Sequence, residues 1–144
     1  MHMTRFIALA VCALLLAPIP ALAAARVELT QSVTPRGGAA PGERLRYTIV
    51  AKNTGDRAAA RLAPSVKIPA GERYIENTAG PTAEFSIDGG KTWSRQPMVT
   101  VTNPGGAVTQ RRALPAEFNA IRWLAPELLA PGARMTFAYD VIVE

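Results

Sequence analysis

The chain has 144 residues with 16 Lys and Arg, 11 Asp and Glu, one Cys and one His, and its formal net charge is +5. Charges of both signs are interspersed along it, which is typical of a soluble surface and carries no nucleic-acid signature. Cys12 and His2 both lie in the first 23 residues. The rest of the chain therefore lacks the histidine and cysteine that Ser-His-Asp or Cys-His catalysis, or a histidine or cysteine metal site, would need.

The first 23 residues have the pattern of an export signal. Arg5 supplies a positive start, the run from Phe6 to Ala17 is apolar, and Ala21-Leu22-Ala23 offers small residues to signal peptidase. The apolar run is too short to stay in a bilayer as an anchor. We therefore expect cleavage after Ala23, a periplasmic or secreted protein, and contact with the membrane only through the leader. Removing 23 of the 144 residues leaves 121, enough for one hydrophobic core.

The stretch from Pro41 to Asp56 predicts a half-buried strand between two turns, because apolar and polar side chains alternate along it. The apolar side chains are Leu45, Tyr47, Ile49 and Ala51, and the polar ones include Arg44, Arg46, Thr48 and Lys52. The stretch from Pro131 to Val143 repeats the design. It opens with Pro-Gly and places Met135, Phe137, Tyr139, Val141 and Val143 on one face.

Shorter extended segments fill the rest of the chain. Pro64 and Pro69 argue against a helix in the alanine-rich part before Ile68, since proline removes a backbone donor. Further strands are expected at 26–33, 61–68, 73–76, 83–87, 98–102, 107–114 and 118–124, the one at 61–68 with an irregular middle. Short strands separated by frequent turns predict an all-β fold, an antiparallel β-sandwich of about seven to eight strands.

Four turn motifs in order resemble the bacterial conserved repeat domain family, also called domain of unknown function 11. They are Pro41-Gly42 with the strand after it, Asn53-Thr54-Gly55-Asp56, Ile68-Pro69-Ala70-Gly71, and Leu129-Ala130-Pro131-Gly132. The resemblance implies an immunoglobulin-like β-sandwich over residues 42–144, preceded by an N-terminal strand and linker at 24–41. It implies no catalytic residues. A single copy argues against a stalk and favours a separate exported module.

Residues Ser86 to Trp93 match the Asp-box pattern Ser-x-Asp-x-Gly-x-Thr-Trp of sialidase-like propellers. In such a turn the Asp carboxylate accepts backbone hydrogen bonds and the glycines allow positive φ. A propeller needs about four sheets of four strands or more, which this chain is too short to supply. The match therefore predicts a turn held by Asp88, with ligand contact as the second interpretation.

Two tryptophans are candidate platforms for stacking a sugar ring. Trp123 is in phase with Ile121, which favours the core, whereas Trp93 ends a hairpin and is balanced between packing and ligand contact. Asp88, Trp93 and Arg95 are the candidate ligand contacts.

No other constellation indicates chemistry. The carboxylates are scattered at turns and polar strand positions, so solvated surface is favoured over a glycosidase pair. A basic patch of Arg95, Arg111, Arg112 and Arg122 lacks a nucleic-acid motif. We expect no cofactor, no metal and no enzymatic activity. The leading hypothesis is a binding or assembly module of the cell envelope, with an envelope protein or a glycan as partner; the alternative is a carbohydrate-binding module that uses Trp93.

Overall fold

The computed structural model describes residues 23–36 and 39–144. The predicted leader, apart from Ala23, lies outside this range. Among the described residues, no helix is long and apolar enough to cross a membrane.

Nine strands and one short 3₁₀ helix make up the described chain. The 3₁₀ helix η1 spans Pro115–Glu117. The strands are β1 (Val27–Thr34), β2 (Arg44–Asn53), β3 (Ser65–Lys67), β4 (Glu72–Tyr74), β5 (Ala83–Ser86), β6 (Met98–Thr102), β7 (Val108–Arg112), β8 (Ala120–Trp123) and β9 (Arg134–Val143). The prediction of an all-β chain is confirmed, and each of the nine strands overlaps one of the segments expected to be extended.

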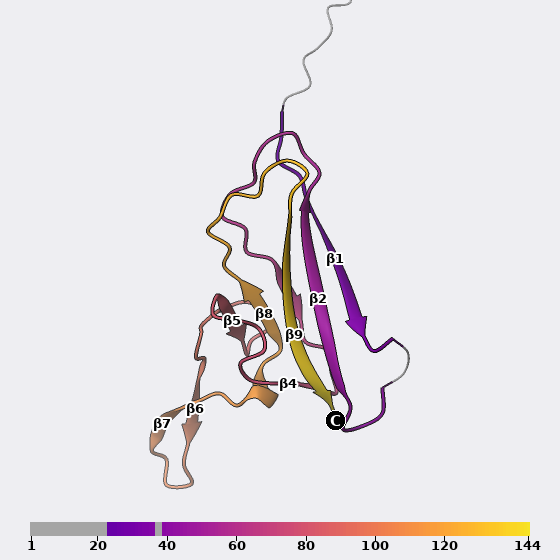
Figure 1. The fold of residues 1–144 in the computed structure, drawn as a ribbon. Coiled ribbons are helices and arrows are strands. Elements are labelled where there is room, and N and C mark those ends of the chain that lie inside the picture. The colour runs from indigo at the N-terminus through magenta and orange to yellow at the C-terminus, as the bar shows by residue number, and fades with distance from the viewer. Residues whose placement is uncertain (1–22, 37–38) are drawn as a thin grey trace, which may run out of the picture.

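The strands form two sheets and a separate hairpin (Figure 1). One sheet has the order β1-β2-β9-β4 and the other has the order β3-β8-β5, with every pair antiparallel. Strands β6 and β7 pair only with each other and project from the body of the molecule. The architecture is therefore an antiparallel β-sandwich with a projecting hairpin.

The alternation in β2 and β9 gives the sandwich its core, as predicted. Leu45, Tyr47, Ile49 and Ala51 are all buried in β2, and Tyr139 and Val141 are buried in β9. Register places Tyr47 opposite Tyr139, where the two rings stack with centroids 5.0 Å apart.

Strand β8 supplies the facing side of the core. Ile121 and Trp123 are fully buried, and the Trp123 indole N–H donates to the carbonyl of Ala79 at 2.8 Å. The prediction that Trp123 is a core residue is confirmed, because its one polar atom has a partner and its ring packs near Phe137 and Tyr139.

The strand predicted at 61–68 is irregular in its middle, as expected, but its paired part is shorter than predicted. Only Ser65–Lys67 pairs with β8, while Leu62 makes an isolated bridge to Ala125. Arg61 has a φ of 54°, which ends extended structure, and Pro64 has no N–H to pair. The segment is therefore two short extended pieces on either side of a break.

The predicted strand at 73–76 also differs, since β4 spans Glu72–Tyr74 and pairs with only the end of β9. The N-terminal strand is part of the sandwich, because β1 pairs with β2 over its whole length.

Candidate functional site

The segment after β5 forms a loop that is closed by its own hydrogen bonds. The backbone groups of Phe85 and Ser94 exchange two bonds, at 2.8 and 3.1 Å. Inside the loop, the Ser86 hydroxyl accepts from the N–H groups of Asp88 and Gly90 and donates to the Asp88 carboxylate at 2.7 Å. Gly89 and Gly90 have φ values of 76° and 91°, which favour glycine.

Asp88 holds the other half of this loop. Its Oδ1 accepts from the N–H groups of Lys91 and Thr92 at 3.0 and 2.9 Å, and its Oδ2 accepts from the Thr92 hydroxyl. These bonds, those from Thr92 above all, hold the pKa of the Asp88 carboxyl well below its usual range. The carboxylate therefore stays charged and is occupied within the loop.

Trp93 is half-buried, and one face of its ring is covered. The Arg122 guanidinium lies 5.0 Å from the ring centroid, a cation–π distance. Arg122 is itself held by Glu84, with Nε to Oε2 at 2.7 Å. Ligand contact by Trp93 stays a prediction. Because Arg122 covers one face of the indole ring, a sugar could stack only on the opposite face.

Arg95 borders a pocket of about 300 Å³ between β4, β5 and the base of the β6–β7 hairpin. This volume is at the lower end of the range for small-molecule sites, about 300–1,000 Å³. The pocket is lined by Tyr74, Glu76, Asn77, Gly80, Pro81, Ala83, Phe85, Arg95, Gln96, Pro97, Arg112, Ala113 and Phe118. We call it the aromatic pocket.

Three aromatic rings form one wall of the aromatic pocket. Phe85 and Phe118 stack with centroids 4.6 Å apart and their planes at 19°, and Tyr74 lies 4.8 Å from Phe85 and 5.9 Å from Phe118. Tyr74 is buried at the base, where its hydroxyl accepts from the Ala79 N–H. The two phenylalanines are half-buried, so part of their surface is available to an apolar ligand group.

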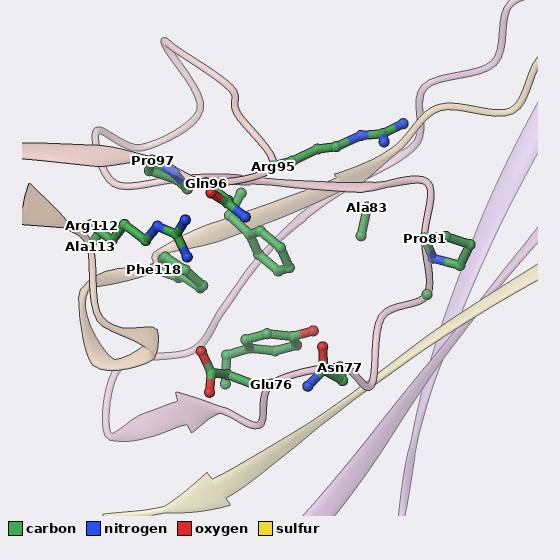
Figure 2. A pocket seen from close by; sticks show the side chains of 13 residues that line it. Glu76, Asn77, Pro81, Ala83, Arg95, Gln96, Pro97, Arg112, Ala113 and Phe118 are labelled. Carbon is green, nitrogen blue, oxygen red and sulfur yellow. The ribbon is translucent and has the colours of Figure 1, made fainter.

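Polar side chains surround these rings. Figure 2 shows Arg112 and Gln96 on one side of the pocket and Glu76 and Asn77 on the opposite side. The head of Arg95 points away from Arg112, and Arg95 also borders a second, apolar hollow beside Leu124. The pocket thus offers a guanidinium, a carboxylate and two amides around an aromatic wall.

The predicted basic patch is divided by the fold. Arg111 forms a two-pronged ion pair with Glu117 at 2.7 and 2.8 Å, which lowers the pKa of Glu117 to about 2. Arg122 pairs with Glu84. Within residues 23–36 and 39–144, neither Arg95 nor Arg112 forms an ion pair, and both line the aromatic pocket.

Of the three predicted contacts, only Arg95 lines this pocket, while Asp88 and Trp93 belong to the neighbouring loop. Glu76, Gln96 and the aromatic wall were not predicted as site residues, because no local sequence pattern marks them. No group of three or more His, Cys, Asp or Glu among the described residues is arranged to hold a metal ion.

No family profile matches the sequence, and no curated protein matches it.

Proposed function

We propose that this chain is an exported, non-enzymatic module that acts by binding in the cell envelope, with the aromatic pocket as its contact site. Export rests on the leader pattern in the first 23 residues. The immunoglobulin-like assignment and membership of the conserved repeat domain family rest on the four turn motifs and belong to this proposal.

The observation that supports binding at this site is the combination of an aromatic wall with a polar rim. Phe85 and Phe118 offer apolar ring surface, while Arg112, Glu76 and Gln96 can form directional hydrogen bonds around it. A few polar groups converging on an apolar surface are the usual composition of a small-ligand site. Sugars present C–H faces and hydroxyls together, so a glycan is the ligand class that fits best.

Glycan binding is the alternative function that the sequence indicated. We now place the glycan at the aromatic pocket instead of at the Trp93 ring. Arg122 covers one face of Trp93, whereas the pocket has half-buried rings and a guanidinium without an ion pair among the described residues. A guanidinium forms its strongest bonds with carboxylates and phosphates. An acidic sugar, such as a uronic acid residue, is therefore the preferred probe.

The absence of enzymatic activity is part of the proposal and has one supporting feature. Glycoside hydrolysis by the usual route needs two carboxyl groups about 5–9.5 Å apart. Glu76 is the single acidic residue among those that line the aromatic pocket.

The test is calorimetric titration of the exported protein with acidic and neutral oligosaccharides from bacterial envelopes. We expect Arg112→Gln to weaken binding of the acidic sugar by at least about tenfold, because a charge-assisted bond contributes about 1.5–3 kcal/mol. Arg134→Gln removes the same charge from the exposed start of β9 and should leave affinity unchanged.

Each other outcome has a distinct meaning. An equal loss of affinity in both arginine variants would show a non-specific charge effect and would contradict binding at the aromatic pocket. The protein could bind no glycan, while the wild type captures a specific envelope protein that Arg112→Gln does not capture. This result would show that the ligand is a protein and that the aromatic pocket is still the binding site. Turnover of a glycan abolished by Glu76→Gln would contradict the non-enzymatic assignment.

A further inference from the structure

Strand β1 is a long free edge of the larger sheet. It pairs with β2 from Val27 to Thr34, and no described strand pairs with its other side. Figure 1 shows β1 at the border of the sandwich, on the side opposite the β6–β7 hairpin. The other border strand, β4, has only three residues. Unpaired backbone groups along β1 are therefore the longest strand-pairing surface on the described molecule.

The hydrogen-bond pattern shows which groups of β1 are free. The Thr54 N–H donates to the Arg26 carbonyl at 2.7 Å, so Arg26 and Thr54 form a hydrogen-bonded pair. In an antiparallel ladder such pairs recur at every second residue. Glu28, Thr30, Ser32 and Thr34 therefore bond β2, and the N–H and C=O groups of Val27, Leu29, Gln31 and Val33 point outward.

This edge lacks the devices that usually block strand pairing. Within Val27–Thr34 there is no proline, no lysine and no interruption of the register, and the one charge is Glu28. Glu28 is engaged with the Thr54 hydroxyl at 3.2 Å. Leu29 is 52 % exposed and lies in a shallow apolar groove with Val27, Leu62 and Pro64. A partner strand would cover apolar surface as well as pair the backbone.

We propose that β1 pairs antiparallel with β1 of a second copy of this chain, in a register centred on Thr30. In this register Val27 meets Val33 and Leu29 meets Gln31, so every outward-facing residue of β1 meets another. A register centred on Gln31 would set Val27 against Pro35, which has no N–H. A register centred on Leu29 would set Val33 against Ala25, outside the strand.

The side chains also match in the Thr30-centred register. Thr30 faces Thr30, a favourable cross-strand pair, and Glu28 faces Ser32, so no like charges are opposed. Two four-stranded sheets become one continuous sheet. The aromatic pocket is built from other strands, so both copies keep it, and the dimer would present two pockets to a polymeric ligand.

The first test is the oligomeric state of the exported protein by sedimentation velocity. Gln31→Pro removes an outward N–H and leaves the β1–β2 bonds intact, because proline is tolerated at the free side of an edge strand. We expect the wild type and Gln31→Thr to form dimers, and Gln31→Pro to raise the dimer dissociation constant by at least about tenfold. A monomeric wild type at millimolar concentration, or a Gln31→Pro variant that dimerises normally, would overturn the proposal.

The second test fixes the register and serves if Gln31→Pro loses its fold. Two Thr30 residues would face each other in a non-hydrogen-bonded pair, with Cα atoms about 4.5 Å apart, within disulfide range. Thr30→Cys should therefore cross-link on mild oxidation. In Glu28→Cys the two thiols would be offset by four residues, roughly 13 Å, and should not. Both variants carry the same Cys12, so a leader thiol would affect them equally. Equal cross-linking would contradict the register.

Discussion

Asp140 on β9 lies directly opposite Arg46 on β2, and the Arg46 Nε donates to the Asp140 Oδ1 at 2.7 Å. Arg44 pairs with the same carboxylate. Asp140 is only 1 % exposed, so its charge is stable there because two guanidinium groups compensate it. The hydrogen bond from Arg46, and to a lesser extent that from Arg44, lowers the pKa of Asp140, although burial of the carboxyl acts in the opposite direction.

This arrangement predicts a specific acid sensitivity. A carboxyl whose pKa is lower in the folded state stabilises the fold above its unfolded pKa, about 3.9, and that contribution is lost as pH falls. We expect Asp140→Asn to lower the free energy of unfolding by about 1–3 kcal/mol at pH 7. At pH 3 the loss should be smaller by about 1 kcal/mol, because the unfolded carboxyl is by then mostly protonated. Urea unfolding at both values measures this. The same loss at pH 7 and pH 3 would contradict the charge pair as the cause.

The stacked tyrosines of the core predict opposite effects of the same substitution. The Tyr139 hydroxyl is buried with no hydrogen-bond partner among the described residues, so Tyr139→Phe should leave stability unchanged or raise it by about 1 kcal/mol. The Tyr47 hydroxyl donates to Glu72 at 2.9 Å, and desolvation, together with Glu72, raises the pKa of Tyr47 to about 12. Tyr47→Phe should cost about 1–3 kcal/mol, since Glu72 then loses that partner. Thermal unfolding of both variants measures the two effects. An equal loss of stability in both would contradict the different hydrogen bonding of the two hydroxyls.

Asn53 predicts the largest effect of a single-atom change. Its side chain is fully buried, and its amide group donates to the carbonyls of Arg57 and Leu129 at 2.7 and 2.9 Å. Asn53→Asp would set a carboxylate oxygen against both carbonyls, so we expect a loss of about 3 kcal/mol or more. Asn103→Asp, at the exposed hairpin tip, is the matched control and should be near neutral. Similar denaturant midpoints for both variants would refute this role.

The expected cleavage after Ala23 predicts a new ion pair. The Ala24 nitrogen lies 2.7 Å from the Asp56 carboxylate, and cleavage would make that nitrogen a charged α-ammonium group. Asp56→Asn should therefore lower Tm by about 2 °C more in the cleaved chain than in a chain that retains Ala23. An equal shift in both chains would argue against cleavage at this bond or against the pair.

Periodicity in the sequence predicts the sheets well and the loops poorly. The alternation in Leu45–Ala51 and in Met135–Val143 predicts the two central strands because one face of each is buried and the other is not. The bend at Arg61, which removes the first residue from the strand predicted at 61–68, is not visible in this way. It depends on a positive φ that a non-glycine residue adopts under tertiary constraint.

The candidate site was only partly predictable for a related reason. Tyr74, Phe85 and Phe118 lie on three separate segments, and only the fold brings their rings together. The pattern around Asp88 is local and predicts its own turn, because its hydrogen-bond partners lie within four residues. Arg95 was predicted because it follows that motif closely in the sequence, and it lines the pocket.

Binding at the aromatic pocket is tested most directly by following the backbone amide chemical shifts of residues 24–144 during titration with an acidic envelope oligosaccharide. We expect saturable shifts concentrated at Asn77, Gln96, Arg112 and Phe118, around the aromatic pocket, with the Lys91 and Thr92 amides unchanged. Shifts centred on the Asp88 loop and Trp93, or no shifts at the aromatic pocket with any envelope fraction, would contradict it.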